Sequence, residues 1–248
     1  MSSVFWWLDN GWLDNEWERK GPLTDTREVE KKEVEKIVRR RPPRFELIAG
    51  ALCLDFVNTL DDRFSSEPKE LLKSYIDLAR FGEDTGILTP GQVDRLFQGS
   101  YTSPEAAQQA LRSAIQLREA IYAVFAAILN RKPVPAAALT TLNGYLQAAA
   151  QYAQLMRVQP GGMKPRFEWR FDALPIGFDA PLWPIARSAA ELLMSEDLQF
   201  VRACASNTCQ WFFLDTSKNH RRRWCDMTKC GNRAKFRRFY RRKQGAST

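Results

Sequence analysis

Apolar residues recur at helical spacing through the middle of the chain. Between residues 68 and 81 they fall at positions 71, 72, 75, 76, 78 and 81, which places them on one face of an α-helix that Gly82 is expected to end. Thr89-Pro90 and Ser103-Pro104 each join an N-capping side chain to a proline in the first helical position. Together these signals predict helices over residues 68–81, 90–97, 104–131, 136–156 and 184–193.

Strand patterns are fewer and shorter. Residues 167–171 alternate apolar and charged side chains, as a half-buried strand does. Residues 210–215 form an apolar run suited to a strand, and residues 221–225 are expected to return beside it as the second strand of a hairpin. The predicted fold class is therefore mainly α with minor β, and the helix over 104–131, apolar on most faces in its second half, is expected to be central.

Three regions differ in composition. Residues 1–44 hold four tryptophans among Asp, Asn and Gly and then a charged segment that ends at Pro42-Pro43, so we interpret them as a variable, partly disordered extension. Residues 45–200 have the pattern of a mostly helical domain. Residues 201–244 are predicted to form a small separate module that carries most of the cysteines.

Composition narrows the class of protein. The 248 residues, 44% of them hydrophobic, allow one large domain or a medium domain with a small module. No apolar run reaches 18 residues, so neither a transmembrane helix nor a membrane partner is expected. The N-terminal sequence lacks a basic segment followed by an apolar one, which argues against a secretory signal and predicts a cytoplasmic, reducing environment.

Catalytic motifs are scarce. The sequence contains no Gly-rich phosphate loop, no HExxH and no GxSxG, and its one histidine, His220, lies near the C-terminus. A Ser-His or Cys-His catalytic pair in the helical domain is therefore excluded, and no pair of carboxylates stands out. We predict that the protein is not an enzyme. The isolated Cys53 lies in an apolar run and is interpreted as a small buried side chain.

The other four cysteines are paired by spacing, as Cys204-x4-Cys209 and Cys225-x4-Cys230. Residues 202–243 also hold 13 Lys/Arg against two acidic residues, an excess of +11 in a chain whose net charge is +8. A segment so short and charged cannot order itself by burial alone, whereas a tetrahedral zinc site supplies on the order of 10 kcal/mol. The pattern favours one zinc ion per chain, with disulfides, iron–sulfur ligation and His220 as a substitute ligand as the alternatives.

A basic helix is predicted after the last cysteine. Phe236, Phe239 and Tyr240 fall at i, i+3 and i+4 and form one apolar stripe, while the arginines and lysine of residues 233–242 mostly face elsewhere. A cysteine knuckle, a hairpin and then a helix whose start carries the second cysteine pair resemble a treble-clef zinc finger.

Two sequence motifs resemble a known family. The run Cys230-Gly231-Asn232-Arg233, together with WFFLDTSKN and RRRWC before it, is similar to the CGNR zinc finger. Upstream, the run LDFVNT over residues 54–59 resembles the opening of the ABATE domain that precedes that finger. The resemblance covers residues 45–243. It implies a bacterial transcription regulator with a link to stress, and with it a finger that binds zinc.

The basic module indicates a nucleic-acid partner, with duplex DNA favoured over RNA, because an arginine-rich helix can enter a major groove and neutralise phosphates. Asn232, Arg233 and Lys235 lie near the helix start, where base contacts are expected. The alternative for these positions is structural, with Gly231-Asn232 as a tight turn and Arg233 as a support for the knuckle. The candidate phosphate contacts are Arg221, Arg222, Arg223, Arg237, Arg238, Arg241 and Arg242.

The helical domain offers fewer signals. Asp55, Asn58 and Thr59 are polar residues in an apolar segment, which makes them candidates for an effector pocket or, alternatively, for buried capping hydrogen bonds. The predicted function is thus a zinc-dependent DNA-binding regulator whose helical domain senses a small-molecule effector or forms a homodimer. An RNA-binding or ribosome-associated protein, and an enzyme with a structural finger, are the alternatives that the sequence leaves open.

Overall fold

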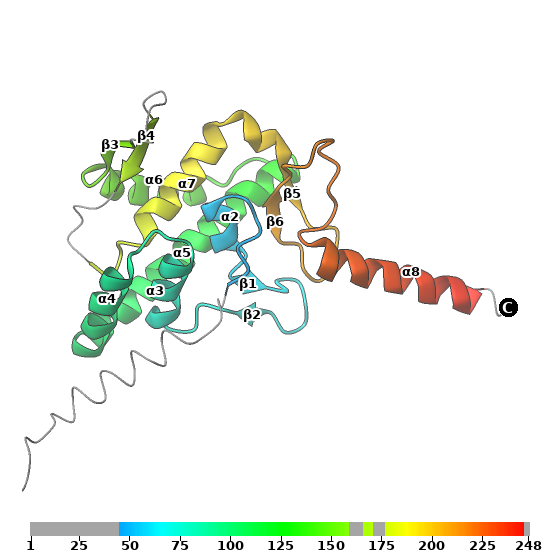
Figure 1. Ribbon diagram of the computed structural model, residues 1–248, viewed down its shortest axis with the longest axis horizontal. Coiled ribbons are helices and arrows are strands. Elements are labelled where there is room, and N and C mark those ends of the chain that lie inside the picture. The colour runs from blue at the N-terminus through cyan, green and yellow to red at the C-terminus, as the bar shows by residue number, and fades with distance from the viewer. Residues whose placement is uncertain (1–44, 159–165, 171–176, 246–248) are drawn as a thin grey trace, which may run out of the picture. The chain divides into compact units, whose positions relative to one another are not determined.

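The computed structural model describes residues 45–158, 166–170 and 177–245, and the predicted extension over residues 1–44 lies outside them (Figure 1). The described residues all belong to one compact unit, Pro43–Thr248. As predicted, the fold is mainly α with minor β. The division into a domain over 45–200 and a finger over 201–244 stays a prediction, since both ranges lie within that unit. No described helix has the length and apolar character needed to cross a membrane.

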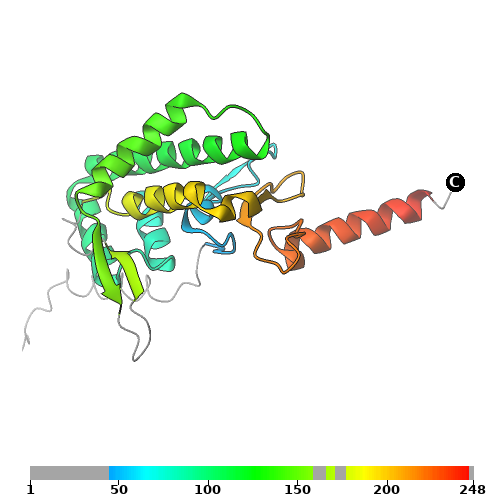
Figure 2. The ribbon, with the colours of Figure 1, turned by 90° about the horizontal axis from the view of Figure 1, so that it is seen from above.

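The central element is the long helix α5 (Pro104–Leu129), as its apolar second half predicted. It packs against α2, α3, α4, α6 and α7 (Figure 2). Leu117, Ile121 and Phe125 of α5 are fully buried, so the core of the helical domain forms around this helix. The helices around it are α2 (Leu52–Val57), α3 (Tyr75–Asp84), α4 (Pro90–Thr102), α6 (Ala136–Ala150) and α7 (Leu182–Met194).

The proline starts of α4 and α5 are confirmed, although the Ser103 side chain makes no capping hydrogen bond before α5. Thr89 and Gln92 form a reciprocal capping box before α4, in which the Thr89 amide donates to Gln92 Oε1 over 2.7 Å.

The helix predicted over residues 68–81 is wrong at both ends, since α3 begins only at Tyr75 and residues 69–70 form a strand. At its other end, α3 continues through Gly82 to Asp84. A Cβ at Gly82 would lie 2.6 Å from Leu88 Cδ1, so this glycine allows close packing inside the helix and does not end it.

The helix predicted to reach residue 156 ends at Ala150. Its expected last turn instead forms strand β3 (Gln154–Val158), which pairs antiparallel with β4 (Arg166–Arg170) and sets Leu155 opposite Trp169. Pairing with β4 satisfies the backbone of residues 154–158, which a single helical pattern could not reveal. The strand predicted over residues 167–171 is confirmed, with a shift of one residue.

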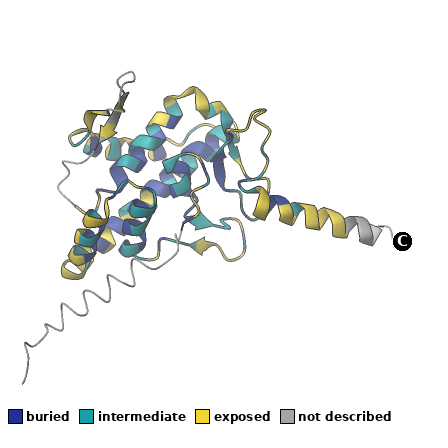
Figure 3. Ribbon diagram, viewed as in Figure 1, coloured by how far each residue is buried: buried dark blue, intermediate teal, exposed yellow. Residues whose placement is uncertain are grey.

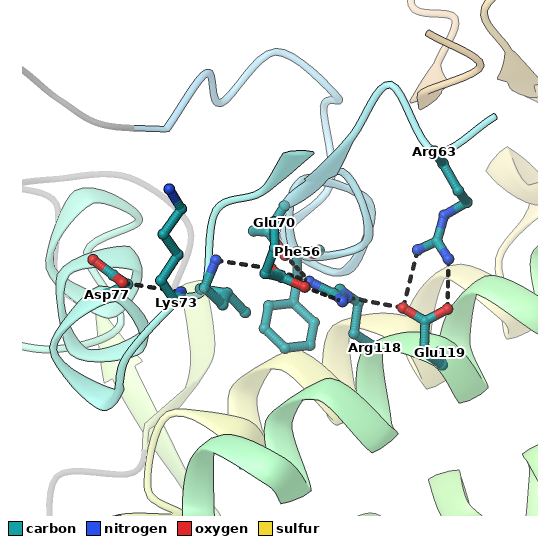
Figure 4. A network of polar contacts seen from close by, with 9 residues as sticks. Phe56, Arg63, Glu70, Lys73, Asp77, Arg118 and Glu119 are labelled. Atoms are coloured by element: carbon teal, nitrogen blue, oxygen red, sulfur yellow. Dashed lines mark hydrogen bonds and ion pairs between the residues drawn. The ribbon is translucent and has the colours of Figure 1, made fainter. Parts of the chain in front are cut away.

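A polar network ties a short hairpin to α5 (Figure 4). The hairpin consists of β1 (Leu60–Asp61) and β2 (Lys69–Glu70). Arg118 of α5 is only 2% exposed, and its Nη1 and Nη2 atoms each donate to a carboxylate oxygen of Glu70 over 2.7 Å. Its Nε atom donates to Glu119, which also pairs with Arg63. The buried charge is therefore fully partnered, as a buried arginine requires.

The predicted hairpin of residues 210–215 with 221–225 is wrong. Strand β6 (Phe212–Leu214) pairs antiparallel with β5 (Val201–Ala203), which precedes the first cysteine, and residues 221–224 form no strand. The β5–β6 pair is joined to the helical domain because the Leu214 amide donates to the Ala49 carbonyl over 2.7 Å. Both strands of this pair lie within the predicted finger, and β5 follows directly after α7 and a short 3-10 turn, Glu196–Phe200.

Candidate metal centre and basic surface

The four predicted cysteines come together in the structure. Their Sγ atoms all lie within 4.8 Å of one another and the four side chains are buried. Cys209 Sγ lies 3.6 Å from Cys225 Sγ, and Cys225 Sγ lies 3.7 Å from Cys230 Sγ. Four sulfurs placed about 2.3 Å from a central zinc at tetrahedral angles would be about 3.8 Å apart. The cluster therefore has the dimensions of a zinc site, and its sulfurs are too far apart for disulfides.

Local structure explains this convergence. Cys204 and Cys209 lie in the connection from β5 to β6, where the Cys204 amide donates to the Trp211 carbonyl over 2.8 Å. The segment just before the second cysteine pair lies beside the first pair, because the Ala205 amide donates to the Arg223 carbonyl over 2.8 Å. The first of these backbone hydrogen bonds closes the loop that holds Cys204 and Cys209, and the second sets that loop beside the segment that leads to Cys225.

Cys230 lies in a helical turn with π geometry, Met227–Gly231. Asp226 caps this turn, because its side chain accepts hydrogen bonds from the amide and the hydroxyl of Thr228. The turn runs directly into α8 (Asn232–Gly245), so the tight turn considered for Gly231-Asn232 is absent. Metal ligation at Cys230 is thereby connected to the orientation of the whole helix.

The pKa values of the clustered thiols indicate that a bound cation would stabilise their thiolate forms. Burial, and then the charge of Cys204, raise the pKa of Cys230. Hydrogen bonds from the thiols of Cys209 and Cys225, helped by backbone amides, lower the pKa of Cys204. Four thiolates cannot coexist in this space without a positive charge, and a zinc ion supplies that charge when it is bound.

Two basic side chains brace the centre from α8 and the turn before it. Arg233 Nη2 donates to Cys230 Sγ over 3.8 Å. Arg233 thus supports the cysteine ligand itself, where a contact with the knuckle had been the alternative. Lys229 forms an ion pair with Glu46, at the start of the described helical domain. His220 is not a member of the cysteine cluster; its ring stacks on Phe200 and its Nδ1 atom lies 2.7 Å from the Asp215 carbonyl oxygen.

The apolar stripe predicted on α8 does not face the finger. Phe236, Phe239 and Tyr240 are 65%, 53% and 60% exposed, and Figure 3 shows the helix as largely exposed. The reason is the position of Cys230, which must face the metal. Residues four, seven and eight positions later share its face, so Ala234, Arg237 and Arg238 turn toward the knuckle in place of the aromatic residues.

The candidate nucleic-acid contacts fall into three groups. Arg222 is engaged internally: its guanidinium lies 4.6 Å from the Phe213 ring centroid and donates to the carbonyls of Trp224 and Cys225. The side chains of Arg241 and Arg242 lie outside the described residues. The exposed group consists of Arg221, Arg223, Asn232, Arg233, Lys235, Arg237 and Arg238.

Comparison with known families fits this geometry. A family model for the ABATE domain, described as "Putative stress-induced transcription regulator", matches residues 50–196. The chain belongs to the ABATE family. A second family model, the CGNR zinc finger, matches residues 201–243, and no curated protein matches the chain.

The chain is thus an ABATE-family protein whose CGNR finger has a site for one zinc ion, held by Cys204, Cys209, Cys225 and Cys230. Both motifs that indicated the family, LDFVNT and Cys-Gly-Asn-Arg, lie within the matched ranges. Neither family is described as a family of enzymes. The description as a transcription regulator is that of the ABATE family.

The candidate effector residues have structural partners. Asp55 Oδ1 accepts the Ala49 amide over 2.9 Å, and burial raises the pKa of Asp55 to about 6. Thr59 Oγ1 donates to the Phe56 carbonyl. Asn58 is bonded to the backbone of Phe212 in the finger. Buried hydrogen bonding, the alternative expected for these residues, is present, and the effector pocket stays a prediction.

Sequence reasoning missed the residues that shape the finger around its ligands. Asp226 caps the turn that carries Cys230, and an Asp two residues before a Thr is the only signal for it. Ser206 and Asn207 of the knuckle line a groove beside α8, for which no motif exists. Ser206 and Asn207 line the groove only because of the way α8 is rotated about its axis. The helical period of the apolar residues alone predicted that the opposite face of α8 turns inward.

Proposed function

We propose that this ABATE protein regulates transcription by binding duplex DNA through its zinc-supported basic helix. The observation that carries the proposal is the set of exposed basic side chains on α8 and in the segment before Cys225. The finger has two acidic residues, Asp215 and Asp226, and within the described residues neither forms an ion pair with this set. A surface of this charge favours a polyanion.

The residues divide by position into two roles. Asn232 and Lys235 are exposed in the first turn of α8, where side chains of a helix in the major groove reach base edges. We assign them to base contacts, and Arg233 to support of the zinc ligand Cys230. Arg222 is left out because its guanidinium is occupied. The proposed phosphate contacts are Arg221, Arg223, Arg237, Arg238, Arg241 and Arg242.

Zinc has an indirect part in this function. It fixes Cys230 to the knuckle, and Cys230 begins the face of α8 on which Ala234, Arg237 and Arg238 lie. Loss of the metal releases that constraint, so DNA binding should depend on zinc without any contact between the metal and the nucleic acid. The helical domain is proposed to sense an effector or to pair two copies on adjacent half-sites.

The test measures duplex binding by the full chain at two salt concentrations. Replacing Arg221 and Arg241, two of the proposed phosphate contacts, with alanine should reduce the dependence of log affinity on log salt by about 2, because about one counterion is released per phosphate contact. The matched control replaces Lys73 and Arg112, two exposed basic residues of the helical domain, and should leave affinity unchanged. Duplex binding without a salt dependence, or equal loss in both double variants, would contradict the proposal.

RNA is tested in the same titrations. Single-stranded and structured RNA of matched length are compared with the duplex, because a basic zinc module can bind either polymer. Tighter binding to RNA at both salt concentrations would assign the surface to RNA. Protein from which zinc has been removed should lose duplex affinity, and added zinc should restore it.

A further inference from the structure

A groove of about 500 Å³ lies between the zinc knuckle and α8. The knuckle contributes Ser206 and Asn207 to its lining, the segment before Cys225 contributes Arg223 and Trp224, and α8 contributes Arg237 and Arg238. Three stretches of chain therefore meet there, and the zinc ligand Cys230, which also lines the groove, joins them.

The lining of the groove is strongly positive. Arg223, Arg237 and Arg238 enter it from two segments, and no acidic residue lines it. None of the three forms an ion pair with any residue in the described part of the chain. Converging guanidinium groups without a carboxylate are the arrangement that binds phosphate, since each offers several donors in a planar fork.

Ser206 gives a second, independent indication of a ligand. The residue is only 6% exposed, and its hydroxyl has no hydrogen-bond partner among the described residues. Buried hydroxyls are almost always partnered, so an exception in the wall of a charged groove points to a group that is bound there in function. The oxygen is buried in the structure, so a turn of the side chain toward the groove would let a phosphate oxygen accept its hydrogen bond.

We propose that this groove binds a phosphate group, held by Arg223, Arg237 and Arg238 and by the hydroxyl of Ser206. The volume is in the range of small-molecule sites and far exceeds one phosphate, so the group arrives attached to a larger molecule. Two sources share this chemistry, a backbone phosphate of DNA and a free phosphorylated ligand. The DNA source rests on the proposed function, whereas the groove itself does not.

The experiment uses the full zinc-loaded chain and two probes. The first is deoxyadenosine 5′-monophosphate with deoxyadenosine as its phosphate-free match, followed by calorimetry, and the second is duplex DNA. The variants are Ser206→Ala and Arg223→Gln/Arg237→Gln. Lys218→Gln is the control, because it removes an exposed charge of the finger that lies outside the groove and outside the proposed DNA contacts.

Ser206→Ala should weaken binding of the phosphorylated probe about tenfold, the usual effect of one hydrogen bond to a charged group. It should not lower the melting temperature of the free protein, because the hydroxyl has no partner to lose. The double arginine variant should weaken binding further, and deoxyadenosine should not bind. Zinc content, measured for each variant, shows that the finger is intact.

The two probes identify the source. Loss of affinity for duplex DNA alone assigns the groove to the nucleic-acid backbone, and loss for the mononucleotide alone assigns it to a free ligand. Unchanged affinity of the Ser206 and arginine variants for both probes overturns the groove but leaves duplex binding by the rest of α8 in place. Mononucleotide binding without duplex binding overturns the proposed function and leaves the groove. If the wild type binds neither probe, both are wrong.

Discussion

Asn58 and Phe212 exchange two hydrogen bonds across the join of the helical domain and the finger. Asn58 Nδ2 donates to the Phe212 carbonyl over 2.9 Å, and the Phe212 amide donates to Asn58 Oδ1 over 3.0 Å. The side-chain amide thus pairs with a strand residue as a neighbouring peptide group would. Behind it, the Phe212 ring stacks on Tyr122 of α5 at a centroid distance of 5.2 Å. Asn58 of the LDFVNT motif is therefore one of the residues that attach the metal centre to the core.

Asn58→Leu should destabilise the protein by about 3 kcal/mol, because it leaves a buried donor and a buried acceptor of Phe212 without partners. The free energy of unfolding in urea measures this. Asn143→Ala, at an exposed position of α6, is the control and should change stability by less than about 0.5 kcal/mol. Equal effects of the two changes would show that the pairing with Phe212 contributes nothing.

Zinc content should depend on the four clustered cysteines and not on Cys53. Cys230→Ser is expected to reduce bound zinc from about one ion per chain to well below one, since three thiolates and a hydroxyl make a weaker site. Cys53→Ala should keep the full complement, because Cys53 is buried in α2 away from the cluster. Metal analysis after dialysis decides, and zinc loss in Cys53→Ala would contradict the assignment.

Replacement of Arg118 should lower the free energy of unfolding. Arg118→Met leaves Glu70 without its cation, but that carboxylate is one-third exposed and Glu119 keeps its ion pair with Arg63, so a loss of about 1 to 3 kcal/mol is expected. Arg112→Met is the matched control on the same helix, at an exposed position where the guanidinium donates to the side chain of Gln109. Thermal or urea unfolding of the two variants gives the comparison, and a similar small loss in both would exclude a structural role for the network.

Stability should depend on pH through Asp55. Its pKa is raised to about 6 in the folded protein, so the folded state holds this proton more tightly than the unfolded state does. Its contribution is therefore fully present below about pH 4 and is lost as the pH rises toward 6. Relative to Asp55→Asn, the wild type should lose about 1 kcal/mol over this range, since the carboxyl is only partly buried.

The difference between the two proteins isolates this group, because zinc release at low pH affects both. Urea unfolding at several pH values between about 4 and 7 measures it. A difference that does not change with pH would show that Asp55 titrates at its ordinary value in the folded protein. The amide oxygen introduced by Asp55→Asn can still accept the Ala49 amide, so the hydrogen bond itself is not the variable.

The sequence predicted what depends on local chemistry. The proline starts of α4 and α5, the central position of α5 and the four ligands all follow from residues close together in the chain. The sequence-based prediction was wrong where segments far apart in the chain compete for pairing with the same strand. β6 pairs with β5 and not with residues 221–225, which instead contact the knuckle through the hydrogen bond from the Ala205 amide to the Arg223 carbonyl.

Arg118 and α8 show two further limits. The helical pattern does not show that Arg118 is buried, because its partner Glu70 lies 48 positions earlier in the chain. For α8, periodicity correctly grouped Phe236, Phe239 and Tyr240 on one face. It could not say which face turns inward, because the metal ligand Cys230 decides that, and its direction is set by three other cysteines.

Since Cys230 begins the helical face that carries the groove arginines, the count of residues from ligand to arginine matters as much as the count between ligands. One residue inserted after Arg233 would leave every cysteine spacing intact, yet would rotate the rest of α8 by about 100° and carry Arg237 and Arg238 out of the groove. Zinc fingers with identical cysteine spacing can therefore differ in what they bind, and grouping them by their ligands alone would merge proteins with different partners.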